Sequence, residues 1–545
     1  MWTTGILEML DTIFRFAISL GLYGLLLVAG FWIWFQWSNR ELLRIASKIP
    51  VALPRVPILG HALFTMQGPE EMARSILEMS TRAIEKGLKY ICFWVGPLPL
   101  IVLQDMDDIS TILNGQNTSD KADEYDYFIT GLDSGVGPFR KNILSSRGAV
   151  WKVTRKHMNP MFHPRNVQHM VPTFNTNSRE LVERMSHHLG NGPFNVLEYT
   201  MDLGLKSICN LIFGPKVEID VNAKGFKGLM YLVEAVPEIF IKRLLKPWLK
   251  SEFLFRLLNR SQLKGYTDKW LEFSKTPLKV CSEELKQKRE GRNITNINEL
   301  HENLANDENK ERINFFDVYS ILQQNYPDFT EADLRCEIVT LYCTGTDTIG
   351  SGTASCLLAL AQYQDVQERL YKEICSVVGP DDDDVTLEDL SNMPYLEMVI
   401  KETLRRFLTV PFLLRKLTKD VDLSEMTLPA GTAIVCNLSA IHMNPKLYPN
   451  PTEFDPERFA PECSAGKEKF AYVPFSGGPR ICIAKTYAMN LMKIEVIHVL
   501  RKFKLSTTQD IQKMKRKLIV TLVSTEGYNI SLERRNPNKQ LTEND

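Results

Sequence analysis

Cys482 lies in a segment whose residue types could bind a metal ion. The segment reads Phe-Ser-Gly-Gly-Pro-Arg-Ile-Cys over residues 475–482. The two glycines and the proline at 477–479 predict a tight irregular loop. The apolar pattern from Ile483 to Leu500 predicts a buried helix directly after it. Backbone N–H groups at a helix N-terminus stabilise a nearby thiolate, and a thiolate of this kind can ligate iron.

Arg480, two residues before this cysteine, supplies a fixed cation suited to a carboxylate. The alternative is that Cys482 is a buried free thiol, which is the usual state of a lone cysteine. The chain has ten cysteines, scattered singly and without a CxxC pair. This distribution disfavours both a disulfide scaffold and a structural zinc site.

The full spacing Phe475-x-x-Gly478-x-Arg480-x-Cys482 resembles the haem-binding loop of the cytochrome P450 superfamily. The resemblance implies haem b as cofactor, with the Cys482 thiolate on the iron and Arg480 at a haem propionate. Ala484 departs from the family pattern, which usually has glycine at that position. The departure puts in doubt how closely the following helix approaches the haem.

Asp347 and Thr348 lie in a second segment, a helix that opens at a capping box at residues 330–333. With Gly345 they resemble the oxygen-activating kink of the same family. The resemblance implies that Asp347 and Thr348 help deliver protons to bound dioxygen. The alternative is that these threonines hydrogen bond to carbonyls of their own helix. Ile349 replaces the usual second alcohol, which puts the efficiency of the relay in doubt.

Thr344 directly precedes the helix glycine. Relatives in the animal microsomal clan often carry a glutamate there, and that glutamate can esterify the haem. Threonine supplies no carboxylate, so the haem is expected to be held without this ester. The stretches Trp151–His163 and Tyr395–Phe459 resemble this clan most closely, and it includes fatty-acid ω-hydroxylases and many insect detoxification enzymes.

Glu402 and Arg405 are spaced i,i+3 and can pair on one helix face. They resemble the family's Glu-x-x-Arg element, although ordinary surface pairs have the same spacing. Arg458, within Phe-Asp-Pro-Glu-Arg-Phe at 454–459, resembles the arginine that completes a Glu-Arg-Arg lock behind the haem. Leu408 departs from the pattern, because many relatives have a proline there.

Trp151 and Arg155 are four residues apart and therefore lie one turn apart on a helix. They resemble the family's Trp-x-x-x-Arg element, which implies that both side chains contact a haem propionate. A packed tryptophan beside a surface arginine is the alternative. Arg415 matches a further propionate-binding position.

The 545-residue chain is 44% apolar and 24% charged, as in ordinary globular proteins. Lys+Arg and Asp+Glu number 65 each, so the net charge gives no argument for nucleic-acid binding. Periodicity predicts one large, mostly α-helical domain with small β-sheets. The resemblance implies that this domain has the cytochrome P450 fold. Helical periodicity includes Ala361–Val377, and the predicted strands include Leu98–Leu103, Thr432–Cys436 and Lys517–Val523.

Residues 16–37 carry no formal charge and are long enough to cross a bilayer as one helix. A cleaved signal peptide is the alternative, but the stretch ends in bulky aromatic residues rather than small ones. Basic residues follow the span, so the positive-inside rule leaves the rest of the chain in the cytosol. The sequence thus predicts an N-terminal transmembrane anchor with its basic flank at 1–48, a proline-rich neck at 49–60, a haem-thiolate domain at 61–532 and a polar tail at 533–545.

Together with the predicted anchor, the resemblance implies a monooxygenase of the endoplasmic reticulum membrane that inserts one atom of O2 into a lipophilic substrate. The resemblance implies a separate NADPH-dependent flavin reductase as partner. It suggests an insect hormone, a fatty acid or a foreign compound such as an insecticide as substrate. The second hypothesis is a haem-thiolate ligand-binding or sensing protein with little turnover, motivated by Ala484, Ile349 and Leu408.

Overall fold

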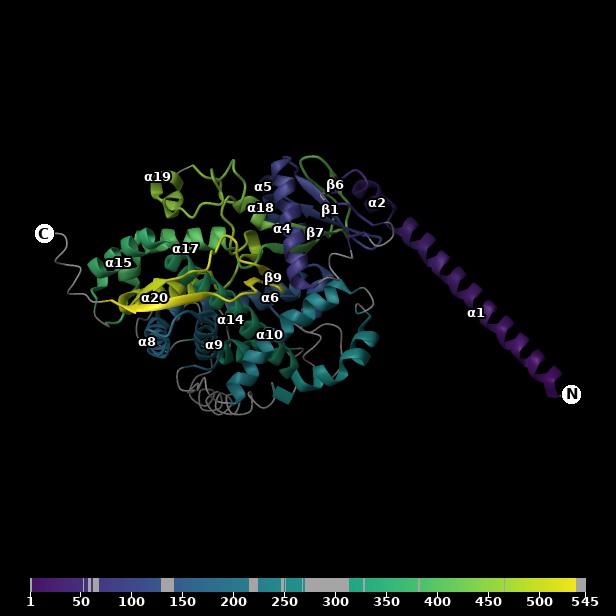
Figure 1. Ribbon diagram of the computed structural model, residues 1–545, viewed down its shortest axis with the longest axis horizontal. Helices are drawn as coiled ribbons and strands as arrows, with labels where there is room; N and C mark the ends of the chain where they lie inside the picture. The colour runs from purple at the N-terminus through teal and green to yellow at the C-terminus, as the bar shows by residue number, and fades with distance from the viewer. Residues whose placement is uncertain are drawn as a thin grey trace.

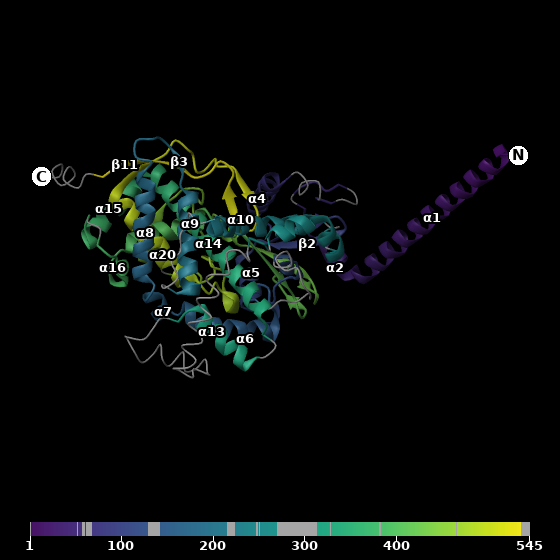
Figure 2. The same cartoon turned by 90° about the horizontal axis from the view of Figure 1, so that it is seen from below.

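The computed structural model has a helical body from which one long helix projects (Figures 1 and 2). Helix α1 (Trp2–Ser38) leaves the body on the side of α2 (Arg40–Ala46). Helices α15 (Gln364–Val378) and α20 (Lys485–Lys502) lie at the opposite end. The structure describes residues 2–535 except for 52, 57–59, 62–67, 129–141, 215–223, 247–248, 250, 267, 270–312, 327–328, 381–382 and 465.

Helices make up most of the body, which confirms the predicted mostly α-helical class. The remaining α-helices with printed bounds are α4 (Pro69–Glu85), α5 (Met106–Asn114), α6 (Gly148–Met158), α7 (Pro164–Gln168), α8 (Val171–Ser186), α9 (Leu197–Phe213), α10 (Lys224–Leu245), α13 (Phe315–Asn325), α14 (Glu331–Gln362), α16 (Leu387–Ser391), α17 (Pro394–Arg406), α18 (Leu438–His442) and α19 (Pro461–Ser464).

The largest sheet described has the strand order β1-β2-β7-β4. Its β2 and β7 pair in parallel, whereas β1 with β2 and β4 with β7 pair antiparallel. These strands are β1 (Tyr90–Val95), β2 (Leu98–Leu103), β7 (Ala433–Asn437) and β4 (Phe412–Lys416). Smaller sheets join β3 (Phe194–Asn195), β11 (Asn529–Arg534) and β8 (Phe503–Ser506), then β5 (Val421–Asp422) with β6 (Thr427–Leu428), and β9 (Arg516–Leu518) with β10 (Leu522–Ser524).

Two predicted elements divide in the structure. The segment Lys517–Val523 is a hairpin rather than one strand, because Leu518 pairs with Leu522 across a turn at 519–521. The helical segment Ala361–Val377 breaks at Tyr363, which has φ −96° and ψ 82°. Its ring stacks on Phe454 at 4.9 Å between centroids, so tertiary packing accompanies the break. Strand β2 has the predicted bounds, and β7 is shifted by one residue.

The capping box predicted at 330–333 is present at the start of α14. Helix α14 packs along α9, and glycines allow the close approach. A Cβ on Gly345 would lie 2.6 Å from Cδ1 of Ile208, and one on Gly350 would lie 2.7 Å from Cγ of Met201. Both distances are shorter than real carbon contacts, so a side chain at Gly345 would displace the Ile208 side chain. At Gly350 the Met201 backbone also lies within 3.1 Å, so a side chain there would push the helices apart.

Among the described residues, one helical segment, Phe14–Ser38, is long and apolar enough to cross a membrane. Most of its described side chains are exposed, with Leu26 68% and Ile33 68% accessible, whereas Phe35 near its end is buried. The proposed neck at 49–60 lies partly outside the described residues, as does the tail at 533–545. Strand β11 continues to Arg534.

Candidate active site

A cavity of about 610 Å³ lies between α14, α6, the loop before α20 and the β1-β2-β7-β4 sheet. It collects most of the residues that the sequence singled out. Arg415 is not among its lining residues, although its neighbour Leu414 is. The cavity-lining residues that the sequence predicted for the site are Trp151, Arg155, Asp347, Thr348, Arg480 and Cys482.

The loop that ends at Cys482 is tight and requires glycine. Gly478 has φ +66°, and a Cβ there would lie 1.9 Å from the carbonyl oxygen of Leu113. No side chain fits at that distance. The loop closes by a hydrogen bond of 2.9 Å from the Cys482 N–H to the Phe475 carbonyl. The closed loop leads directly into α20, which begins at Lys485 with Ala484 as its N-cap residue.

Two cysteines line the cavity, Cys482 and Cys343. Burial raises the pKa of the Cys482 thiol, while the N–H of Ala484 and the cations Arg155 and Lys485 oppose the shift. Burial also raises the pKa of Cys343, and there the nearby Asp347 carboxylate adds to the shift. Only Cys482 of this pair therefore has groups that stabilise its thiolate.

Three buried cations lie beside this loop, and one acid, Asp120, pairs with them: its Oδ1 lies 3.6 Å from Nη2 of Arg480. Burial lowers the pKa of Arg480 to about 9, and the nearby Arg415 adds to the shift. Burial likewise lowers the pKa of Lys121, with contributions from both arginines. Among the described residues, Nε and Nη1 of Arg480 and Nε of Arg415 are buried without a hydrogen-bond partner. Buried cationic donors of this kind favour an anionic group beside them, so the donor set fits the propionates of a haem.

Trp151 and Arg155 connect helix α6 to this loop. The guanidinium of Arg480 lies over the Trp151 ring at 3.9 Å from its centroid. Nη1 of Arg155 donates to the carbonyl of Ile481 at 2.9 Å, one residue before Cys482. The tryptophan and the arginine therefore hold the two sides of one loop, which a packed tryptophan beside a surface arginine would not do.

Helix α14 presents threonines to the cavity at one-turn intervals. Thr340, Thr344 and Thr348 all line it, and each hydroxyl donates to the carbonyl four residues earlier. For Thr348 this bond, to the Thr344 carbonyl, is 2.6 Å long. The hydroxyl oxygen can still accept a hydrogen bond from water or a ligand, so the bond to the helix carbonyl does not remove Thr348 from cavity chemistry.

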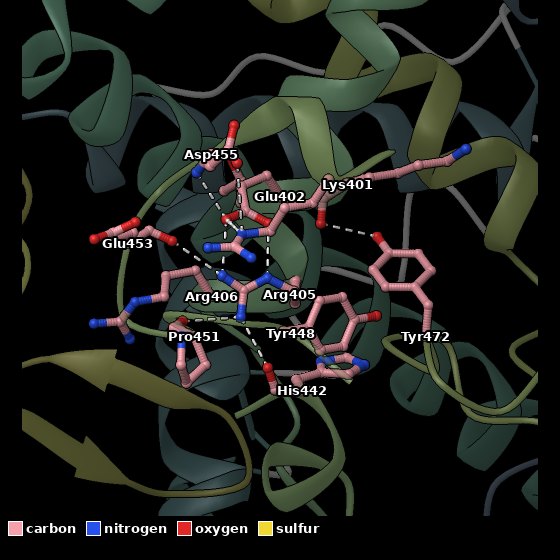
Figure 3. Close-up of polar contacts among 12 residues, drawn as sticks. Lys401, Glu402, Arg405, Arg406, His442, Tyr448, Pro451, Glu453, Asp455 and Tyr472 are labelled. Carbon is pink, nitrogen blue, oxygen red and sulfur yellow. Dashed lines mark hydrogen bonds and ion pairs between the residues drawn. The ribbon is translucent and has the colours of Figure 1, made fainter. Parts of the chain in front are cut away.

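Glu402 and Arg405 form a buried ion pair on α17 (Figure 3). Nε and Nη2 of Arg405 donate to the carboxylate at 2.7 and 2.8 Å, and its guanidinium also reaches the carbonyls of His442 and Pro451. Nε of Arg458 lies 3.6 Å from Glu402. The structure thus brings the predicted Glu-Arg-Arg group together. Its charges lie away from the cavity lining, which indicates a structural role.

Three residues at or beside the cavity were missed from the sequence. Lys121 and Thr521 line the cavity, but each lies outside any motif. Glu337 lies on α14 three turns before Thr348, so the spacing of 11 residues could have placed it on the same face. Its carboxylate accepts a 2.8 Å hydrogen bond from the N–H of Ile143, another cavity-lining residue.

Glu337 predicts a pH dependence of stability. Burial raises its pKa to about 8, from 4.5 for an unperturbed glutamate. The folded state therefore holds this proton more tightly, and the resulting stability is present below pH 4.5 and is lost as the pH rises through about 8. Between pH 4.5 and about 8 we expect the stability of the wild type, measured by thermal unfolding, to fall more than that of Glu337→Gln. Parallel profiles of the two proteins would contradict the assignment.

The fold and the cavity together define a class of protein, a haem-thiolate oxidoreductase. Residues 50–532 match the family model described as cytochrome P450. The chain belongs to the cytochrome P450 family. It is therefore a monooxygenase that binds haem through a thiolate-ligated iron, which confirms the predicted fold, enzyme class and cofactor.

Relatives from insects and mammals match along most of the chain. Cytochrome P450 4c21 of Blattella germanica is 29% identical over 510 residues, which cover 92% of this chain and 96% of that protein. Cytochrome P450 4c3 of Drosophila melanogaster is 29% identical, with 90% and 89% covered. Cytochrome P450 4V2 of Homo sapiens is 28% identical, with 90% and 91% covered. These matches agree with the predicted microsomal animal type.

Proposed function

We propose that this chain is a membrane-anchored monooxygenase of the endoplasmic reticulum whose iron ligand is Cys482. The observation that carries the proposal is the cavity, which is lined by Cys482 and by the pair Asp347 and Thr348. When bound, the haem supplies the reductive activation of dioxygen and the insertion of one oxygen atom into the substrate. A separate NADPH-dependent flavin reductase supplies the electrons.

The residues that would hold the haem come from four parts of the chain. Arg480 and Arg415 supply buried cationic donors for the propionates, and Lys121 adds a third charge beside them. Trp151 and Arg155 position the loop around Arg480 and Cys482. Thr348 and Asp347, which line the same cavity on α14, hold and move protons, and the largely apolar lining disfavours water.

The cavity also supports a lipophilic substrate taken from the membrane. Most of its wall is apolar, including Phe93, Phe240 and Ile241. It reaches Asn39 and Leu42, the first residues after the long exposed helix α1. An apolar cavity that extends to the end of a membrane anchor suits a molecule dissolved in the bilayer. Fatty acids, insect hormones and lipophilic foreign compounds all have this character.

The test is turnover of the full-length protein in vesicles that also contain a microsomal flavin reductase. With NADPH and a panel of long-chain fatty acids and lipophilic foreign compounds, we expect an oxygenated product that carries one atom from labelled O2. Haem-loaded protein that oxidises no member of the panel, while the reductase is active, would instead favour the ligand-binding hypothesis.

Thr348→Ala is expected to separate NADPH oxidation from product formation. Loss of the hydroxyl removes a proton-delivery group, so the product formed per NADPH should fall by about 10²-fold, the lower end of acid–base contributions, with peroxide released instead. Thr340→Ala is the matched control, because Thr340 lies two turns before Thr348 on α14, lines the same cavity and donates in the same way to a helix carbonyl, that of Cys336. If both variants form the same amount of product per NADPH, Thr348 has no special role in proton delivery.

Thr344 predicts that the haem is released intact. Its hydroxyl donates to the Thr340 carbonyl at 2.7 Å and its side chain has no carboxylate to esterify the haem. Acidified organic solvent should therefore extract unmodified haem from the wild type, as judged by chromatography and mass. Thr344→Glu should retain a fraction of the haem on the polypeptide. Haem bound covalently to the wild type would show that another residue forms the link.

A further inference from the structure

The Asp347 carboxylate is held by a residue from a distant part of the chain. The hydroxyl of Thr521 donates to Oδ2 of Asp347 at 2.6 Å. A weaker contact of 3.5 Å joins Oδ1 to the hydroxyl of Ser351, one turn further along α14. Asp347 is 7% exposed and Thr521 is 1% exposed. The bond is therefore shielded from water, where a hydrogen bond to a charged group is strongest.

Thr521 lies at the turn of the β9–β10 hairpin. Leu518 and Leu522 pair across the base of this turn, and the N–H of Leu522 donates to the Thr409 carbonyl at 2.8 Å. Leu518 and Val520 line the same cavity as Thr521. The turn thus makes two kinds of contact. The apolar side chains of Leu518 and Val520 line the cavity, and the hydroxyl of Thr521 bonds to the Asp347 carboxylate.

A hydroxyl is suited to this position because it can serve both protonation states of an acid. It donates to a carboxylate and, after rotation of its own proton, accepts from a carboxylic acid. Cys343 and Tyr528 also lie near Asp347, but both are acids that burial keeps protonated by raising their pKa. Thr521 is a neighbour on the cavity wall whose neutral hydroxyl can bond to Asp347 in both of its protonation states.

We propose that Thr521 is a positioning residue for Asp347 and that the β9–β10 turn couples substrate contact to the orientation of this acid. The inference rests on the proposed function of Asp347 in proton delivery. A substrate that packs against Leu518 and Val520 sets the position of Thr521, because the three residues share one short turn. Thr521 in turn holds the carboxylate in the orientation from which it serves the proton path.

The test compares three purified haem-loaded variants. Thr521→Val removes the hydroxyl at nearly constant volume, and Thr521→Ser retains it. Thr525→Val is the matched control, an exposed threonine on the same hairpin that bonds to Lys515 instead. We expect Thr521→Val to lower the product formed per NADPH by about tenfold, as loss of an outer partner of a functional group does. Thr521→Ser and Thr525→Val should stay within about twofold of the wild type.

A second readout does not depend on turnover. In urea unfolding, Thr521→Val and Asp347→Ala together should cost no more than the larger single change, because each removes one partner of the same hydrogen bond. In Thr521→Val, the substrate affinity measured by optical titration should change less than the product formed per NADPH. Two outcomes would overturn this inference alone. One is that the unfolding effects of the two changes are additive, and the other is that Thr521→Val forms as much product per NADPH as an active wild type. A wild type that forms no product would overturn the proposed function as well.

Discussion

Replacing Cys482 with alanine is expected to abolish the thiolate signature of the protein and its oxygenase activity. The reduced, carbon-monoxide-bound wild type should show the Soret band typical of a thiolate ligand, and Cys482→Ala should lack it. Activity should fall by more than about 100-fold, because even outer partners of metal ligands cost up to that much when removed. The physical reason is that Cys482 alone of the two cavity cysteines has groups beside it that favour the thiolate.

Cys343→Ala is the matched control for this experiment. Its thiol lines the same cavity, but burial and the Asp347 carboxylate both raise its pKa and so disfavour the thiolate. We expect this variant to keep the Soret band and to bind haem in the same amount. Thermal unfolding of both variants separates loss of the ligand from loss of the fold. A Soret band that persists in Cys482→Ala and disappears in Cys343→Ala would reverse the assignment.

The parts of the site that could be predicted are those whose residues lie close together in the chain. The loop at 475–482 combines a sharp turn, a cation and a cysteine within eight residues, and the structure shows why glycine at 478 is required. The capping box of α14 and the pairs Trp151–Arg155 and Glu402–Arg405 also depend on local spacing. Helical geometry alone brings such neighbours to one face.

The parts that could not be predicted depend on tertiary contacts between distant segments. Thr521 is 174 residues from Asp347, and no local pattern relates the two positions. The hairpin that carries Thr521 was predicted as one strand, since its turn at 519–521 contains Ile, Val and Thr rather than glycine, proline or asparagine. Lys121 is a single lysine between Asp120 and Ala122, and only its burial beside Arg415 and Arg480 reveals it.

Gly345 has a packing role in addition to the role that the sequence suggested for it. By resemblance, the sequence relates this glycine to the family's oxygen-activating kink, which stays a prediction for α14. The structure adds a packing reason, since any side chain at 345 would collide with Ile208 of α9. The position of Thr348 in the cavity therefore depends on how α14 packs against α9 as well as on the residues around the kink.

Glu402→Ala is expected to destabilise the fold more than any other single change considered above. Both members of the Glu402–Arg405 pair are inaccessible to solvent, and the N–H of Asp455 also donates to the Glu402 carboxylate. Removing the carboxylate leaves the Arg405 charge buried beside carbonyls only, and breaking a buried pair in this way costs about 3–5 kcal/mol of unfolding free energy. Urea unfolding of the haem-loaded protein, together with the haem content after purification, measures the loss.

Lys401→Gln, on the same helix, is the control for this prediction. Lys401 pairs with Glu397 near the surface, where its side chain is 32% exposed, so the change should cost at most about 1 kcal/mol. A Glu402→Ala variant as stable as Lys401→Gln would show that the carbonyls around Arg405 suffice to hold its charge. The expected difference instead follows from burial: the carboxylate of Glu402 is what allows Arg405 to bind the segments at 442 and 451 without water. Those segments support the loop before Cys482, since a ring nitrogen of His442 accepts the N–H of Val473 at 2.9 Å.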